Sequence, residues 1–374
     1  MTKKFILFDM DGVLLKPGGY HQALKATVSR IGEALGVPNA DLTDDQIAHF
    51  EALSVTNEWD SAAISASLIL LKAWRFDPDI RLGNQPIRYV VLTDQAPEID
   101  LFLNTFTDVG DLPTVSAYEK ITRENSWLNV SQRDTLKRLL YHSRDIYKSP
   151  ILPWHQETVL GSRTFQENYN LEPKLNIESY LTSYDRQVMS NETRKNIQAW
   201  LKNPEHRAGI MTNRPSSTPP GYLSSPEAEL GAKLVEVDHL PLVGSGMLAW
   251  FAATQCELPD HTFLKPNPVH ALALIQMCWG ASATNALQLA YDLWRGGGKK
   301  EDWNLFNGSH ITIFEDAVKG LQAGISSQAL LEEIGIEIDL RLVGISSNPI
   351  KRAELEKIAD VVHSDINQFD WVEV

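Results

Sequence analysis

The chain has 374 residues, 43% of them hydrophobic and 22% charged, which is typical of a globular protein with two or three domains. Its formal net charge of −14 argues against a nucleic-acid backbone or an anionic membrane surface as a partner. No segment approaches the run of about eighteen apolar residues that a membrane helix needs, and the N-terminus lacks a signal-peptide core, so we expect a cytoplasmic protein. Cys256 and Cys278 lie outside any metal or redox motif and are expected to be buried thiols.

An apolar run over residues 4–8 leads straight into Asp9 and Asp11. The run is continuous rather than alternating, which predicts a parallel strand buried on both faces, with both carboxylates at its carboxyl end. Gly12 then allows the backbone to turn sharply. Two carboxylates so close repel each other unless a cation or a shared proton relieves them, which indicates a hard metal such as Mg²⁺. Because D-x-D-G also occurs in solvated turns and calcium loops, the motif alone is a hypothesis.

After a Pro-Gly-Gly loop, residues 20–202 are predicted to be mainly helical. Apolar residues recur at helical spacing in five stretches, namely 23–35, 47–53, 61–74, 129–147 and 190–201. Two segments rich in Pro, Asn, Asp and Gly, 76–114 and 146–178, are predicted to be long irregular connections. Within the first of them, residues 87–92 are interpreted as either a short strand or an extended loop.

From residue 207 onward, short apolar runs alternate with helical stretches, a pattern that predicts βαβ units around a parallel sheet. The predicted strands are 208–211, 233–237, 311–314, 340–345 and 360–363. The predicted helices are 226–232, 245–254, 268–294, 317–333 and 350–358. The fold class is therefore α/β, a Rossmann-like doubly wound parallel sheet split in sequence between residues 1–15 and 205–374, with a mainly helical domain, 16–204, inserted.

Polar groups follow the strand predicted at 208–211. Thr212 and Asn213 place a hydroxyl and an amide at its carboxyl end, where they and the backbone N–H groups that follow suit phosphate oxygens. Since Thr-Asn is also common in turns, a plain turn is the alternative. Arg214 comes next, and the sequence leaves open whether it meets a phosphate or a residue of the inserted domain.

Two more strand ends carry charged side chains. Lys265 stands between an apolar stretch and a Pro-Asn-Pro sequence, and this rigid setting makes an anchored lysine as plausible as a solvated one. Glu315 and Asp316 end the apolar run 311–314, where they could complete a divalent metal site with Asp9. Acidic residues are also favoured at a helix N-terminus, and the two roles are compatible.

The order and placement of these motifs resemble the haloacid dehalogenase-like (HAD) hydrolase superfamily, specifically its phosphoglycolate phosphatase and β-phosphoglucomutase branch. The resemblance rests on FDMDGVLL at 8–15, GIMTNRP at 209–215, LKPNP at 264–268 and IFEDAVKGLQAG at 313–324. It covers the split sheet domain, whereas the inserted segment fits the helical cap of that branch in position only.

The resemblance implies a role for each matching residue. Asp9 corresponds to the nucleophile and Asp11 to the general acid and base. Phosphate binding falls to Thr212, with Asn213 beside it, and to Lys265, which also offsets the charge of the nucleophile. A Mg²⁺ cofactor would be held by Asp9, Asp316 and the backbone carbonyl of Asp11, with Glu315 as a further candidate.

These roles predict a Mg²⁺-dependent phosphatase that acts on a small phosphorylated metabolite through an aspartyl-phosphate on Asp9. A phosphosugar mutase of the same superfamily is the alternative, and a non-catalytic binding protein that retains the fold is another. A general acid and base at Asp11 argues against the binding protein and against dehalogenation, neither of which needs it. The oligomeric state is left open.

Two departures from the family pattern bear on the substrate. About fifty residues separate Lys265 from Glu315, which predicts an extra helical insertion around 280–308. The inserted domain is larger than a minimal cap, and its one compact polar cluster is Asn57, Glu58, Trp59 and Asp60. This cluster is a candidate for substrate specificity, although a helix cap packed by the tryptophan is the stronger interpretation.

Overall fold

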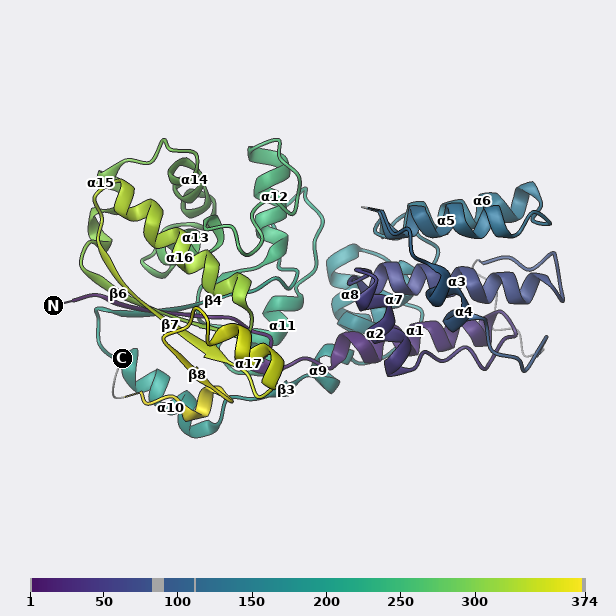
Figure 1. Cartoon of the computed structure of the whole chain (residues 1–374), viewed down its shortest axis with the longest axis horizontal. Helices are drawn as coiled ribbons and strands as arrows, with labels where there is room; N and C mark the ends of the chain where they lie inside the picture. The colour runs from purple at the N-terminus through teal and green to yellow at the C-terminus, as the bar shows by residue number, and fades with distance from the viewer. Residues whose placement is uncertain (1, 83–90, 111, 372–374) are drawn as a thin grey trace. The chain divides into compact units, whose positions relative to one another are not determined.

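The computed structural model describes residues 2–82, 91–110 and 112–371, and the chain divides into two compact units. One unit, the sheet unit, joins Met1–Pro17 to Asp185–Val374, and the other, the helical unit, is Gly18–Tyr184. The second boundary lies twenty residues before the expected 204/205. Residues 185–204 belong to the sheet unit because helix α10 (Asn191–Trp200), which lies beside the sheet in Figure 1, has Ile197 and Trp200 buried in the core of this unit.

The sheet unit is built on six parallel strands in the order β5-β4-β1-β6-β7-β8, which confirms the predicted α/β class. The strands are β1 (Lys4–Phe8), β4 (His206–Met211), β5 (Leu242–Val243), β6 (Ser309–Glu315), β7 (Ile338–Ile345) and β8 (Val361–His363). A separate antiparallel ribbon pairs β2 (Leu15–Lys16) with β3 (Arg186–Gln187), so that the chain segments leaving and re-entering the sheet unit run side by side.

Strand β1 is apolar and buried from Phe5 to Phe8 because helices cover both faces of the sheet. Phe5 and Leu7 pack into the core formed with α12, α13, α14 and α16, while Ile6 and Phe8 pack on the opposite face with α10 and α11. Figure 1 shows α13, α14 and α16 on one side of the sheet and α10 on the other. Besides α10, the helices of this unit are α11 (Glu227–Leu234), α12 (Ser245–Gln255), α13 (Val269–Cys278), α14 (Ala283–Trp294), α15 (Lys300–Trp303), α16 (Val318–Glu333) and α17 (Pro349–Leu355), with 3₁₀ turns at Asn304–Phe306 and Ile366–Gln368.

Two predictions in this unit are wrong. The strand expected at 233–237 is the end of α11 and the turn after it, and the edge strand is β5. Val235 and Val237 are buried without strand pairing, and the left-handed backbone of Glu236 (φ 58°) interrupts the extended run. The single helix expected at 268–294 is two helices, because Gly280 (φ 100°) turns the chain between α13 and α14.

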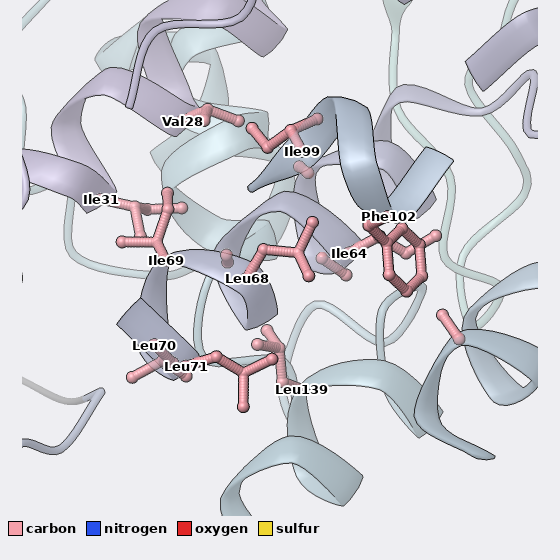
Figure 2. Packing of buried hydrophobic residues seen from close by; sticks show 14 of the residues in the cluster. Val28, Ile31, Ile64, Leu68, Ile69, Leu70, Leu71, Ile99, Phe102 and Leu139 are labelled. Carbon is pink, nitrogen blue, oxygen red and sulfur yellow. The ribbon is translucent and has the colours of Figure 1, made fainter. Parts of the chain in front are cut away.

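The helical unit packs around α3 (Glu58–Trp74), whose residues are almost all buried. Alanine and serine along α3 let neighbouring helices approach closely, and Figure 2 shows Ile64, Leu68 and Leu71 meeting side chains of the surrounding helices. Those helices are α1 (Gly19–Ala34), α2 (Asp44–Ala52), α4 (Ile99–Thr105), α5 (Pro113–Glu124), α6 (Val130–Tyr141), α7 (Leu152–Leu160), α8 (Ser162–Tyr169) and α9 (Tyr180–Tyr184). Among the described residues of either unit, no helix combines the length and apolarity needed to cross a membrane.

The segments expected to be irregular contain helices. The first includes α4 and the start of α5, and the second includes α7 and α8. Prolines misled the interpretation here, because Pro113 and Pro153 occupy the first turn of α5 and α7, where a missing N–H costs nothing. The possible strand at 87–92 falls mostly outside the described residues.

Leu139 tests the core of the helical unit, since its side chain is fully buried beside α3 (Figure 2). We expect Leu139→Ala to lower the free energy of unfolding by roughly 2–5 kcal/mol, because it removes buried methyl groups and leaves a cavity. Leu101→Ala is the matched control: Leu101 is 60% exposed, and its loss should cost about 0.5 kcal/mol or less. Urea unfolding followed by circular dichroism measures both, and equal losses would contradict the packing described.

Candidate active site

The carboxyl ends of β1, β4 and β6 lie at one edge of the sheet, and they bring the sequence motifs together. Asp9 directly follows β1 and is only 6% exposed, with its backbone N–H donating to the carbonyl of Phe314 in β6 at 2.9 Å. Gly12 has φ 80°, and a Cβ there would lie 2.6 Å from Oδ2 of Asp316. Glycine is therefore needed both for the turn and for the approach of the second acidic motif.

Lys265 follows no strand, contrary to the expectation, but lies in a loop and is buried among the three strand ends. Its Nζ donates to Oδ1 of Asp9 at 2.7 Å, to the carbonyl of Met211 at 2.9 Å and to Oε1 of Glu315. The lysine is 9% exposed and Glu315 only 1% exposed. The sequence left an anchored lysine open, and the structure shows one that joins the ends of β1, β4 and β6.

Aromatic packing supports the loop that carries Lys265. Phe263, two residues earlier, is fully buried and packs edge-on against Tyr291 and Trp294 of α14, with ring centroids 5.8 and 5.6 Å away. Helix α14 belongs to the insertion expected around 280–308. The insertion therefore contributes part of the core beneath the lysine loop.

Asp9, Glu315 and Asp316 could hold a metal ion, because one carboxylate oxygen from each lies within 4.8 Å of the others. In α16, Gly320 faces Glu315 so closely that any side chain there would overlap the carboxylate. Asp316 is half-buried, and its Oδ2 accepts from Nζ of Lys351, an exposed residue of α17, at 2.6 Å. Three carboxylates against two ammonium groups, those of Lys265 and Lys351, leave an excess of negative charge, which suits a hard cation.

Burial and crowding shift the ionisation of this cluster. Burial raises the pKa of Asp9 to about 6; Lys265 opposes the shift, and the charge of Asp11 adds to it. Burial, then the charge of Asp9, also raises the pKa of Glu315 well above its ordinary value. Burial opposes the charge on Lys265, but its two carboxylate partners outweigh burial and raise its pKa. The lysine therefore stays charged, and a further cation would favour the ionised form of Asp9.

Thr212 lies next to this cluster, buried at the end of β4. Its backbone N–H donates to the carbonyl of Val243 at 3.0 Å, and the same carbonyl contacts Nε2 of His270 at 2.9 Å. Because a carbonyl only accepts, the ring proton of His270 is on Nε2. Asn213, the other candidate of this motif, is exposed.

Arg214 is buried and contacts two carboxylates, one of which, Asp185, lies within the segment expected to be inserted but belongs to the sheet unit. Its Nε and Nη2 donate to both carboxylate oxygens of Asp11, with Nη2–Oδ1 at 2.6 Å and Nε–Oδ2 at 2.9 Å. Its Nη1 lies 2.8 Å from Oδ2 of Asp185, a buried carboxylate. Sequence reasoning missed Asp185 and Lys351, because neither belongs to a motif and each reaches the site through the fold alone.

The cluster at 57–60 begins helix α3 of the helical unit. Asp60 is buried, and its carboxylate accepts from Ser143 at 3.0 Å and from Nη2 of Arg144 at 2.6 Å. These contacts tie α3 to the turn after α6, which is a structural role for Asp60. Asn57 precedes the helix and is exposed, whereas Glu58 and Trp59 are half-buried.

Comparison with known proteins supports the fold of the chain but shows no family for it. No family model and no curated protein sequence matches the chain. A crystal structure from the Northeast Structural Genomics Consortium is similar with a TM-score of 0.63 at 16% identity, over 98% of this chain and 97% of the other. Phosphatase Tt82 from Thermococcus thioreducens aligns with a TM-score of 0.48 at 13% identity, over 94% of this chain and 99% of the other. The first likeness supports the α/β architecture.

His270 gives the site a measurable pH dependence. Burial, with the nearby charge of Lys265, lowers its pKa from 6.5 to about 3. A histidine held neutral in the folded state contributes stability above pH 6.5, and this contribution is lost as the pH falls toward 3. We expect the wild type to lose roughly 2 kcal/mol more than His270→Gln between pH 7.5 and pH 5. Urea unfolding at both pH values measures the difference, and parallel losses in the two proteins would contradict a neutral buried His270.

Proposed function

We propose that this chain is a Mg²⁺-dependent phosphatase of the HAD superfamily that hydrolyses a small soluble phosphomonoester. The observation that carries the proposal is the buried contact of Lys265 with Asp9 and Glu315, at the strand edge where Asp316 and Thr212 also lie. Binding alone would not require a buried carboxylate held against a lysine at the centre of an acidic cluster. Phosphoryl transfer requires a fixed nucleophile and cations around the transferred group.

Asp9 is the proposed nucleophile. One of its oxygens forms a bond to phosphorus as the bond from phosphorus to the leaving oxygen breaks, which gives an aspartyl-phosphate and an alcohol. Water then attacks the phosphorus of the aspartyl-phosphate, which releases inorganic phosphate and regenerates the carboxylate. Lys265 fixes the orientation of Asp9 through its contact with Oδ1 and keeps a positive charge beside it in both steps.

Asp11 is the proposed general acid and base. It is two residues from the nucleophile, and its side chain is one-third exposed, so that it can reach both substrate and water. In the first step its carboxyl group gives a proton to the leaving oxygen, and in the second its carboxylate takes a proton from the attacking water. The two aspartates thus divide the work between attack on phosphorus and proton transfer.

The rest of the cluster would bind the phosphate and the metal. Lys265, the Thr212 hydroxyl and backbone N–H groups after β4 offer donors to the phosphate oxygens, and the exposed Asn213 is a further candidate. Asp9, Asp316 and the Asp11 carbonyl would hold Mg²⁺, with Glu315 as a further candidate ligand. When bound, Mg²⁺ supplies positive charge to the phosphate oxygens.

The helical unit would act as a cap that selects the substrate, a small phosphorylated metabolite in the cytoplasm. Within its 57–60 cluster, Asn57, Glu58 and Trp59 remain candidates for specificity, whereas Asp60 is engaged by Ser143 and Arg144.

Removal of the nucleophile is the direct test of the reaction. Wild-type protein with Mg²⁺ should release phosphate from 4-nitrophenyl phosphate, and Asp9→Asn should lower kcat by more than about a thousandfold, because an amide cannot form the acyl phosphate. Asp238→Asn, the same change at an exposed aspartate, is the control and should keep wild-type activity. Retention of turnover in Asp9→Asn would refute the nucleophile, and an inactive wild type over a broad panel of phosphate esters would refute the phosphatase.

Metal binding can be measured without turnover. After treatment with EDTA and dialysis, activity should disappear and return with Mg²⁺, and Mg²⁺ at 100 times its Kd should stabilise the wild type by about 2.7 kcal/mol. Asp316→Asn should lose most of this stabilisation. Lys351→Met is the matched control, since it breaks the same ion pair but keeps the carboxylate, and it should retain the response. Equal responses in wild type and Asp316→Asn would place the metal elsewhere.

A further inference from the structure

A buried arginine with two carboxylate partners stands beside the proposed active site. Arg214 is 3% exposed, and its Nε and Nη2 donate hydrogen bonds to the two carboxylate oxygens of Asp11. Its Nη1 lies 2.8 Å from Asp185, whose side chain is completely buried. The backbone N–H of Arg214 also donates to Oγ1 of Thr212 at 3.1 Å. One residue thus touches the proposed acid and base, a phosphate-binding candidate and an interior carboxylate.

We propose that Arg214 is a positioning residue for Asp11, and that Asp185 in turn holds Arg214 in place. The proposal rests on the phosphatase activity proposed above. Asp11 has a short side chain on a tight turn, and no strand or helix fixes its rotamer. The planar guanidinium contacts both of its oxygens, which restricts rotation of the carboxylate about its own bond.

The position of Asp185 explains why this arrangement can be rigid. Asp185 is the first residue of the sheet unit after the helical unit, and the next two residues form β3, which pairs with β2. Leu15 of β2 is four residues after Asp11, and its carbonyl accepts from the N–H of Gly12 at 2.7 Å. The ribbon therefore anchors the segments that carry both carboxylate partners of Arg214.

The close packing around Arg214 leaves its side chain little room for another conformation. In α11, Gly231 lies so near that a Cβ there would be 3.3 Å from Nη1 of Arg214 and would overlap the sulfur of Met10. A lysine could supply the charge at this place but not the two parallel donors, so the geometry requires arginine in particular.

Substrates with different leaving groups separate positioning from general structural damage. The oxygen of 4-nitrophenyl phosphate leaves without help from an acid, whereas the alkoxide of an alkyl phosphate such as glycerol phosphate needs a proton. The parameter kcat/KM reports the steps up to the first irreversible one, which is transfer to Asp9. Misplacement of Asp11 should therefore lower kcat/KM for the alkyl ester and leave the aryl ester nearly unchanged.

We expect Arg214→Met to lower kcat/KM for the alkyl phosphate roughly 10- to 100-fold and for 4-nitrophenyl phosphate less than about threefold. Arg214→Lys should recover only part of the loss. Asp185→Asn, which removes a charge at constant shape, should show the same selectivity to a smaller degree, and it keeps the test open if Arg214→Met folds poorly.

Arg194→Met is the matched control. Arg194 is also buried in the sheet unit, where it contacts Glu236 and Asn191 rather than the site. Its loss should lower the melting temperature and affect both esters equally. An equal decrease in kcat/KM for both esters in Arg214→Met would overturn the positioning role. An increase in kcat/KM for the alkyl ester would overturn it too, because it would mean that Arg214 hinders proton transfer by Asp11.

A stability cycle tests the contact even if the protein hydrolyses no phosphate ester. If Arg214 and Asp11 are paired in solution, Arg214→Met and Asp11→Asn should not be additive, and the double variant should lower the melting temperature by less than the sum of the single variants. Additive shifts would overturn the proposal whatever the activity. If the wild type is inactive but the melting-temperature shifts are non-additive, the proposed phosphatase activity is refuted and the contact between Arg214 and Asp11 is supported.

Discussion

The contact on which the site depends is the buried ammonium of Lys265 between Asp9 and Glu315. Removing two carboxylates from water is costly, and a single lysine can offset the cost only if its geometry is fixed. Here the same Nζ also donates to the carbonyl of Met211, so three separate strand ends share one cation. With Asp316 nearby, the cluster remains negative, and this imbalance is the physical reason to expect a metal ion.

Much of the sheet unit serves to hold these charges at short distance. Gly12 and Gly320 are the positions where a side chain would collide with Asp316 and Glu315, so the absence of a Cβ there is a condition of the cluster. The insertion also packs Tyr291 against Phe263 and so supports the lysine loop. Aromatic packing thus supports the loop of Lys265, and the two glycines leave room for the carboxylates of Asp316 and Glu315.

Two aspartate–arginine pairs show how similar chemistry serves different ends. Asp60 is buried, and with Arg144 and Ser143 it fastens a helix to a neighbouring turn inside the helical unit. In the sheet unit the arginine is the buried member, and Asp11 stays partly exposed, as its proposed role in proton transfer requires. The exposure of the carboxylate, more than the presence of the pair, distinguishes a group that can exchange protons from one that holds the fold together.

The parallel sheet and the residues at its strand ends, Asp9, Thr212, Glu315 and Asp316, could be predicted from sequence, because continuous apolar runs followed by polar groups are local patterns. Lys265 was also expected at a strand end, but it lies in a loop. The strand predicted at 233–237 was wrong, since local propensity cannot tell a buried turn from a strand. Helices α5 and α7 were overlooked because each has a proline in its first turn. The contacts of Arg214 with Asp11 and with Asp185, in contrast, became visible only in the folded structure. A long side chain can reach several partners, and which of them it meets depends on how segments distant in sequence pack together.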